Sequence, residues 1–119
     1  MKSLVLGTLE QEVLSVIWNS SNPLSVREVL KVLKGDYAYT TIMTVMSRLE
    51  KKGLLKRIAK GNLFLYTFTE NKSTYANKHL KSIYSSLVDS YGELAISQFV
   101  DSIKKDDKNM KLLEDFLNK

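Results

Sequence analysis

The sequence predicts a mainly α-helical fold that contains one small β-hairpin and ends in a second helical region. Apolar residues recur with the 3.6-residue period of an α-helix in three segments before Gly53. The period then changes to two on either side of a Gly61-Asn62 pair. A helical period returns from Tyr75 onward. We therefore expect three helices, a hairpin, and then helices again.

Length and composition narrow the class of protein. The 119 residues suffice for one globular domain with a small addition, and 44% of them are hydrophobic. The absence of cysteine excludes disulfides, thiolate metal sites and a cysteine nucleophile. No stretch approaches the roughly 18 apolar residues of a membrane span, and the apolar run at the N-terminus is too short for a signal peptide. We expect a cytoplasmic protein.

Positive charge is concentrated in the first part of the chain. Residues 1–70 contain ten cations and six acids, whereas residues 71–119 contain eight and seven. Six of the ten cations lie between Arg48 and Lys60. This clustering predicts a polyanionic partner. The alternative is a basic surface that is merely solvated, which explains the net charge of +5 but not the clustering.

The first two helices are expected to begin at capping boxes, in which side chains three positions apart satisfy free backbone N–H groups. Thr8-x-x-Gln11 begins the first helix, and the turn formers of 19–23 end it. Ser25-x-x-Glu28 begins the second, which Lys34-Gly35-Asp36 ends. The expected inner faces carry Leu9, Val13, Val16 and Ile17 in the first helix and Val26, Val29, Leu30 and Leu33 in the second.

The segment from Tyr39 to Gly53 predicts a third helix with two contrasting faces. Its apolar stripe consists of Ile42, Val45, Met46 and Leu49. Its polar face carries Thr40, Thr41, Thr44, Ser47, Arg48 and Lys51. Short hydroxyl side chains and cations, with Glu50 as the one acid, suit contact with phosphates and base edges. We interpret it as a DNA-recognition helix; the alternative is an outer face that simply lacks acids.

Two β-forming runs, 54–60 and 63–69, flank Gly61-Asn62, a pair typical of a two-residue hairpin turn. Phe64, Tyr66 and Phe68 should share one face of the hairpin, and Gly61 should adopt a positive φ. Lys56, Arg57 and Lys60 lie on the first strand and at the tip. Three helices and a hairpin with a basic tip form a winged helix-turn-helix, whose wing cations reach the DNA backbone.

Residues 70–74 form a polar break, and we place the boundary there, with a DNA-binding domain at 1–71 and a helical domain at 72–119. The apolar seam of the second domain consists of Ala76, Leu80, Ile83, Leu87 and Tyr91, with Tyr84 and Val88 beside it, and continues through Phe99, Leu113 and Phe116. Three short helices cannot bury these stripes on each other. We expect a symmetric homodimer through residues 75–117. The alternative is a larger monomer core formed with the first domain.

Residues that would support catalysis or metal binding are scarce. His79 is the only histidine and has no acid at helical spacing. Gly53 and Gly61 fit a helix end and a hairpin turn better than a phosphate-binding loop. Asp106 or Asp107 fits the N-cap of a last helix. We expect no enzyme activity, no cofactor and no metal site.

The chain resembles the penicillinase-repressor family of bacterial transcriptional regulators (the BlaI/MecI/CopY type) over roughly residues 5–70. The matching stretches are Leu9–Trp18, Ser25–Val29 and Ala38–Leu55, followed by a hairpin that closes on Tyr66. The most specific match lies in the third helix. It consists of Tyr39-Thr-Thr, Thr44, Arg48-Leu49 and Lys52-Gly53. The C-terminal part matches in its helical layout.

This resemblance implies a dimeric repressor that binds an inverted repeat at a promoter, commonly that of a β-lactamase or other resistance operon. It assigns operator contacts to Thr40, Thr41, Thr44 and Arg48, and wing contacts to Arg57 and Lys60. A Cys-x-Cys copper sensor is excluded because the chain has no cysteine.

In the β-lactam-responsive branch of the family, a membrane sensor protease cuts an Asn-Phe bond in the dimerisation domain. This chain has no Asn-Phe, and Gln98-Phe99 is the nearest equivalent. A rival function is a winged helix that binds another protein through the hydroxyl-rich face. The cations between Arg48 and Lys60 argue against that alternative, because such a role does not require a basic wing.

Overall fold

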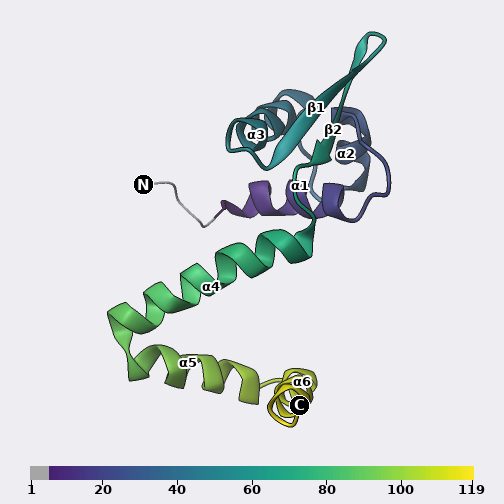
Figure 1. Cartoon of the computed structure of the whole chain (residues 1–119). Coiled ribbons are helices and arrows are strands. Elements are labelled where there is room, and N and C mark those ends of the chain that lie inside the picture. Colours follow the sequence, from purple (N-terminus) through teal and green to yellow (C-terminus); the bar gives the residue numbers. More distant parts are fainter. Residues whose placement is uncertain (1–5) are drawn as a thin grey trace. The chain divides into compact units, whose positions relative to one another are not determined.

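The computed structural model describes residues 6–119. Two compact units divide the chain, one ending at Asn77 and the other running from Lys78 to Lys119. The elements are α1 (Thr8–Trp18), α2 (Val26–Val32), α3 (Tyr39–Lys51), β1 (Leu55–Lys60), β2 (Leu63–Phe68), α4 (Lys72–Tyr91), α5 (Glu93–Lys104) and α6 (Asp107–Leu117) (Figure 1). The predicted class, mainly helical with one antiparallel hairpin, is confirmed.

The first unit is organised around α3, against which α1, α2 and β1 pack. Its buried core consists of Val13, Leu14, Ile17, Val26, Val29, Ile42, Val45, Met46, Leu49, Leu55 and Tyr66. All four residues of the predicted α3 stripe are in this core, so the 3.6-residue period identified the inner face of α3 correctly. The opposite face of α3 is left to solvent.

Helix capping differs from the prediction at α1 and agrees with it at α2. The N-cap of α1 is Gly7, so the predicted box of Thr8 and Gln11 is wrong. Glu10 reaches back instead, and its Oε1 accepts the Gly7 N–H at 3.2 Å. At α2 the Ser25 hydroxyl accepts the Glu28 N–H at 3.2 Å, as expected. The helix ends at Val32, just before the predicted Lys34-Gly35-Asp36 stop.

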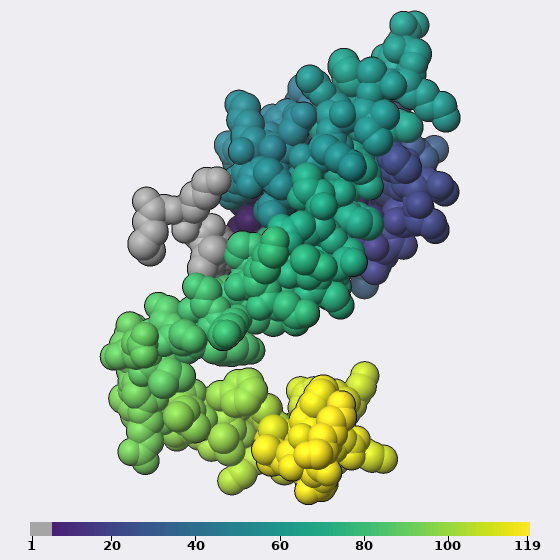
Figure 2. Space-filling model, viewed as in Figure 1, coloured from purple at the N-terminus to yellow at the C-terminus, as the bar shows by residue number. Residues whose placement is uncertain are grey.

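The hairpin has the predicted turn, with Gly61 at φ 60°. Leu55 lies opposite Phe68, and Arg57 lies opposite Tyr66. Two backbone hydrogen bonds between Leu24 and Tyr66, of 2.9 and 2.7 Å, attach β2 to the segment before α2. The base of the hairpin is thus fixed to the helices, while its tip extends beyond them, as the space-filling view shows (Figure 2).

The first turn of α4 belongs to the first unit. The predicted polar break at 70–74 is shorter than expected, because Asn71 Oδ1 accepts the Thr74 N–H at 2.9 Å and α4 already begins at Lys72. The Trp18 indole N–H donates to the Glu70 carbonyl at 3.1 Å. The ring of Tyr75 lies 5.3 Å from that of Trp18, and burial raises the Tyr75 pKa. The compact units separate after Asn77, inside α4.

The second unit contains the rest of α4 together with α5 and α6. Gly92 has a φ of 58° and separates α4 from α5, and Asp106 Oδ1 caps α6 through the Lys108 N–H at 2.9 Å. None of the described residues in these three helices is buried. The unit therefore has apolar stripes, as predicted, but no interior of its own.

Two features are absent from the described part of the chain. Within residues 6–119, no group of three or more acidic or histidine side chains is placed to hold a metal ion. No helix in that range combines the length and the apolar character needed to cross a bilayer.

Candidate nucleic-acid interface

The polar face of α3 carries the side chains predicted to contact DNA, and most of them are exposed. The exposed ones are Thr40, Thr41, Thr44, Arg48 and Lys51. Ser47 is half-buried, because it lies on the side of α3 that faces the hairpin rather than at the centre of the polar face. The sequence thus placed this face correctly, except that Ser47 is less accessible than the period implied.

One hydroxyl on this face is already engaged. The Thr44 Oγ1 donates to the Thr40 carbonyl at 2.9 Å. A hydroxyl has one proton and two lone pairs, so in this conformation the Thr44 oxygen can accept a hydrogen bond but cannot donate one to a ligand. The Thr44 methyl group remains available for apolar contact.

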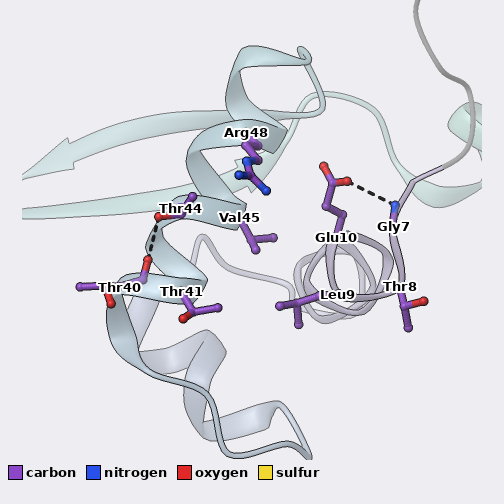
Figure 3. Close-up of a pocket in the computed structure, with 9 residues that line it drawn as sticks. All are labelled: Gly7, Thr8, Leu9, Glu10, Thr40, Thr41, Thr44, Val45 and Arg48. Carbon is purple, nitrogen blue, oxygen red and sulfur yellow. Dashed lines mark hydrogen bonds between the residues drawn. The ribbon is translucent and has the colours of Figure 1, made fainter.

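Two hollows flank α3, and the first lies between α3 and the start of α1. The α1–α3 hollow is lined by Gly7, Thr8, Leu9, Glu10, Thr40, Thr41, Thr44, Val45 and Arg48. Figure 3 shows Thr41, Val45 and Arg48 on the side of α3 that faces α1. Most of the residues predicted to read the operator therefore lie along this hollow.

An acid faces these residues across the α1–α3 hollow. The Glu10 Oε2 pairs with the Lys52 Nζ at 2.7 Å. That hydrogen bond, and then the Gly7 N–H, lower the Glu10 pKa, with a smaller contribution from Arg48. The carboxylate is thus ionised at neutral pH. Its charge is already paired with that of Lys52, so Arg48 remains as a positive charge beside this hollow.

The second hollow lies on the other flank of α3. The α3–hairpin hollow is lined by Ser25, Val26, Arg27, Tyr39, Met43, Ser47, Arg57, Asn62, Leu63, Phe64 and Tyr66. The Arg57 guanidinium lies 4.3 Å from the centre of the Phe64 ring, and its Nε is 3.8 Å from the Glu50 Oε2. The Arg27 guanidinium lies 5.2 Å from the centre of the Tyr39 ring. Two arginines thus lie within cation–π distance of aromatic rings in one hollow.

The wing cations do not act as one group. Successive residues of a strand point to opposite faces, so Arg57 shares the face of Tyr66, whereas Lys60 belongs to the other face. Lys56, Arg57 and Lys60 are all exposed. Lys51 and Lys60 line neither hollow. The structure therefore brings together Arg57 and Ser47 on one flank of α3, and the threonines with Arg48 on the other.

Sequence reasoning missed Arg27 and Glu10. Arg27 stands in the first turn of α2, where the helix dipole disfavours a cation. Its neighbour Tyr39 lies on the next helix, and no local period brings the two together. The pairing of Glu10 with Lys52 spans 42 residues, and no local period encodes it.

The residues predicted to form a dimer surface fall mainly in the second unit. The α4–α5 hollow there has a volume of about 410 Å³ and is lined by Tyr84, Leu87, Val88, Ala95, Ile96, Gln98, Phe99 and Ser102. The rings of Tyr84 and Phe99 meet edge-on at 5.9 Å. Among the other predicted residues, Leu80, Tyr91 and Phe116 are exposed and Ile83 and Leu113 are half-buried. Ala76 lies in the first unit.

Comparisons with known proteins identify the family. The profile of the penicillinase repressors matches residues 6–119. The transcriptional regulator BlaI of Mycobacterium tuberculosis is 46% identical over 55 residues, which are 44% of this chain and 40% of that protein. The penicillinase repressor of Bacillus licheniformis is 36% identical over 72 residues, 59% of this chain and 56% of that protein. The matched segments thus span about half of these relatives.

Solved structures agree with this assignment. The DNA-binding domain of the repressor BlaI superposes with a TM-score of 0.53 at 36% identity, covering 61% of this chain and 92% of that one. The Bacillus licheniformis BlaI monomer bound to the blaP half-operator gives a TM-score of 0.50 at the same identity and coverage. MepR, a regulator of a Staphylococcus aureus efflux pump, shares the fold at 15% identity and a TM-score of 0.53. The chain belongs to the penicillinase-repressor family of transcriptional regulators.

Proposed function

We propose that this protein is a cytoplasmic repressor that binds an inverted-repeat operator as a homodimer and blocks transcription of a β-lactamase or other resistance operon. The observation that carries the proposal is the outer face of α3. It exposes three threonines and two cations, Arg48 and Lys51, next to a basic hairpin. The related BlaI monomer bound to a half-operator supports DNA as the ligand.

In this mechanism α3 lies in the major groove. Exposed Thr40 and Thr41 can contact base edges or thymine methyl groups. The engaged Thr44 hydroxyl can only accept, which favours the amino group of an adenine or a cytosine. Arg48 and Lys51, with the hairpin cations Arg57 and Lys60, would contact mainly phosphates. These contacts supply salt-dependent affinity with little sequence information.

The apolar surface of the second unit supports the dimer. Eleven large hydrophobic side chains of this unit are 41% to 74% exposed. At roughly 150 Å² for each fully exposed side chain, they leave about 900 Å² uncovered. A standard protein interface covers about 800 Å² on each partner. A two-fold related copy that covers most of these eleven side chains, within and beside the predicted seam, would therefore bury enough surface for a stable dimer.

Release from the operator is proposed to follow cleavage of the dimer region by a membrane sensor protease. The proposed bond, Gln98–Phe99, lies within α5, and both residues are exposed and line the α4–α5 hollow. Cleavage requires a local opening of this helix. Incubation with the cognate sensor under inducing conditions should yield a fragment that starts at Phe99, identified by mass spectrometry. A chain that stays intact would remove this step from the proposal.

Selection of bound duplexes from a random DNA pool near physiological salt tests the proposed function. The purified protein should enrich an inverted repeat. Bound DNA without an enriched motif would show electrostatic attraction alone and would contradict specific repression. Elution from heparin distinguishes the repressor from the rival function. A winged helix that binds a protein partner should elute at modest salt, and a DNA-binding protein should elute later.

A further inference from the structure

We propose that the α3–hairpin hollow seats a phosphate of the DNA backbone and that Arg27 of α2 contacts it. This inference rests on the DNA-binding function proposed above and adds a contact outside α3 and the wing. Arg27 is exposed and lines the hollow together with Arg57.

The charges of the two hollows distinguish them. The α1–α3 hollow is lined by one cation and one acid, Arg48 and Glu10, and that acid is paired with Lys52. The α3–hairpin hollow has two cations, Arg27 and Arg57, and none of the described residues that line it is acidic. The Glu50 Oε2 lies 3.8 Å from the Arg57 Nε, beside this hollow. An anion on the hairpin flank of α3 would therefore meet two lining arginines, whereas Arg48 is the one cation that lines the other flank.

Both arginines lie within cation–π distance of an aromatic ring in the absence of any ligand. Arg27 lies over Tyr39, and Arg57 lies over Phe64. A guanidinium that stacks through its flat face keeps its N–H groups free around its edge. Those groups match phosphate oxygens and can bond to two of them at once. Stacking therefore restricts the side chain without using up its hydrogen-bond donors.

The location of the hollow fits a DNA backbone. A helix in the major groove, which is about 12 Å wide, has a phosphate backbone on each side. The α3–hairpin hollow runs beside α3, and Tyr39, Met43 and Ser47 form its wall on that helix. A backbone beside α3 would therefore lie over Arg27.

The salt dependence of binding tests the contact, with Lys31→Gln as the matched control for Arg27→Gln. Both residues are exposed cations of α2, but Lys31 does not line the hollow. Arg27→Gln should weaken binding to operator and random DNA alike and should reduce the slope of log K against log salt by about 0.9, the value for one phosphate. Lys31→Gln should change the slope much less. Equal slope changes in the two variants would overturn the contact.

A double-mutant cycle tests the role of the ring. Tyr39→Leu should weaken binding by about threefold relative to Tyr39→Phe, which keeps the ring. When Arg27 is also replaced by Gln, the Tyr39→Leu and Tyr39→Phe variants should bind DNA equally, because the ring acts through Arg27. An undiminished difference would overturn the positioning role of Tyr39. If the wild-type chain does not bind DNA, the proposed function itself fails; a wild type that binds with an inert Arg27 refutes this inference alone.

Discussion

Truncation of Phe99 to alanine should dissociate the proposed dimer. Phe99 is 47% exposed in the single chain and lines the α4–α5 hollow. With roughly 200 Å² for a whole phenylalanine, about 90 Å² remains for a partner to cover. At about 25 cal/mol per Å², this contributes about 2 kcal/mol for each protomer. Two-fold symmetry doubles the loss to about 4 kcal/mol, which raises the dimer Kd by about a thousandfold.

Sedimentation equilibrium over a concentration series measures that Kd. Ser97→Ala, an exposed position on the same helix, is the control and should leave the Kd near the wild-type value. Circular dichroism should show that Phe99→Ala keeps its helices. A Kd that rises by less than about tenfold, with the helices intact, would place the dimer interface elsewhere.

Three further results are expected. Thr44→Ala should reduce the preference for the operator over random DNA by about fivefold, since one hydrogen bond is lost; equal losses on both DNAs would refute base readout. Lys60→Ala should weaken binding to all DNA and reduce the salt slope by about 0.9, whereas an unchanged slope removes the hairpin tip from the phosphate contacts. Glu10→Gln should lower the free energy of unfolding by about 0.2–1 kcal/mol at pH 7, measured in urea. A carboxylate whose pKa is lowered by folding stabilises the fold above its ordinary pKa of 4.5 and loses that contribution as the pH falls through the folded pKa. The difference between the two proteins should therefore shrink as the pH falls below 4.5 and vanish below the folded pKa. A difference that persists at low pH would contradict the ion pair with Lys52.

Local patterns predicted much of the first unit. The i, i+3, i+4, i+7 spacing of the α3 stripe identified residues such as Ile42 and Leu49, which the structure buries completely. The Gly61-Asn62 pair located the hairpin turn because a tight two-residue turn favours positive φ at such a position. These features depend on neighbouring residues, so the sequence shows them directly.

Long-range contacts were harder to predict. The link of Trp18 to Glu70 and Tyr75, which joins the first turn of α4 to α1, spans more than 50 residues. The stacking of Arg27 on Tyr39 depends on how α2 packs beside α3. Helix ends also shifted: Gly7 replaced Thr8 as the cap of α1, because the choice depends on which N–H the Glu10 side chain reaches.

The affinity for one half of the operator tests the central claim most directly, namely that two linked copies of α3 read two half-sites. The duplex enriched from the random pool would be compared with the same duplex carrying one scrambled half. We predict two protomers on the intact repeat and a loss of affinity of at least about a hundredfold on the scrambled one, since linkage makes the second contact intramolecular. One protomer on each duplex with equal affinity would contradict a dimeric repressor.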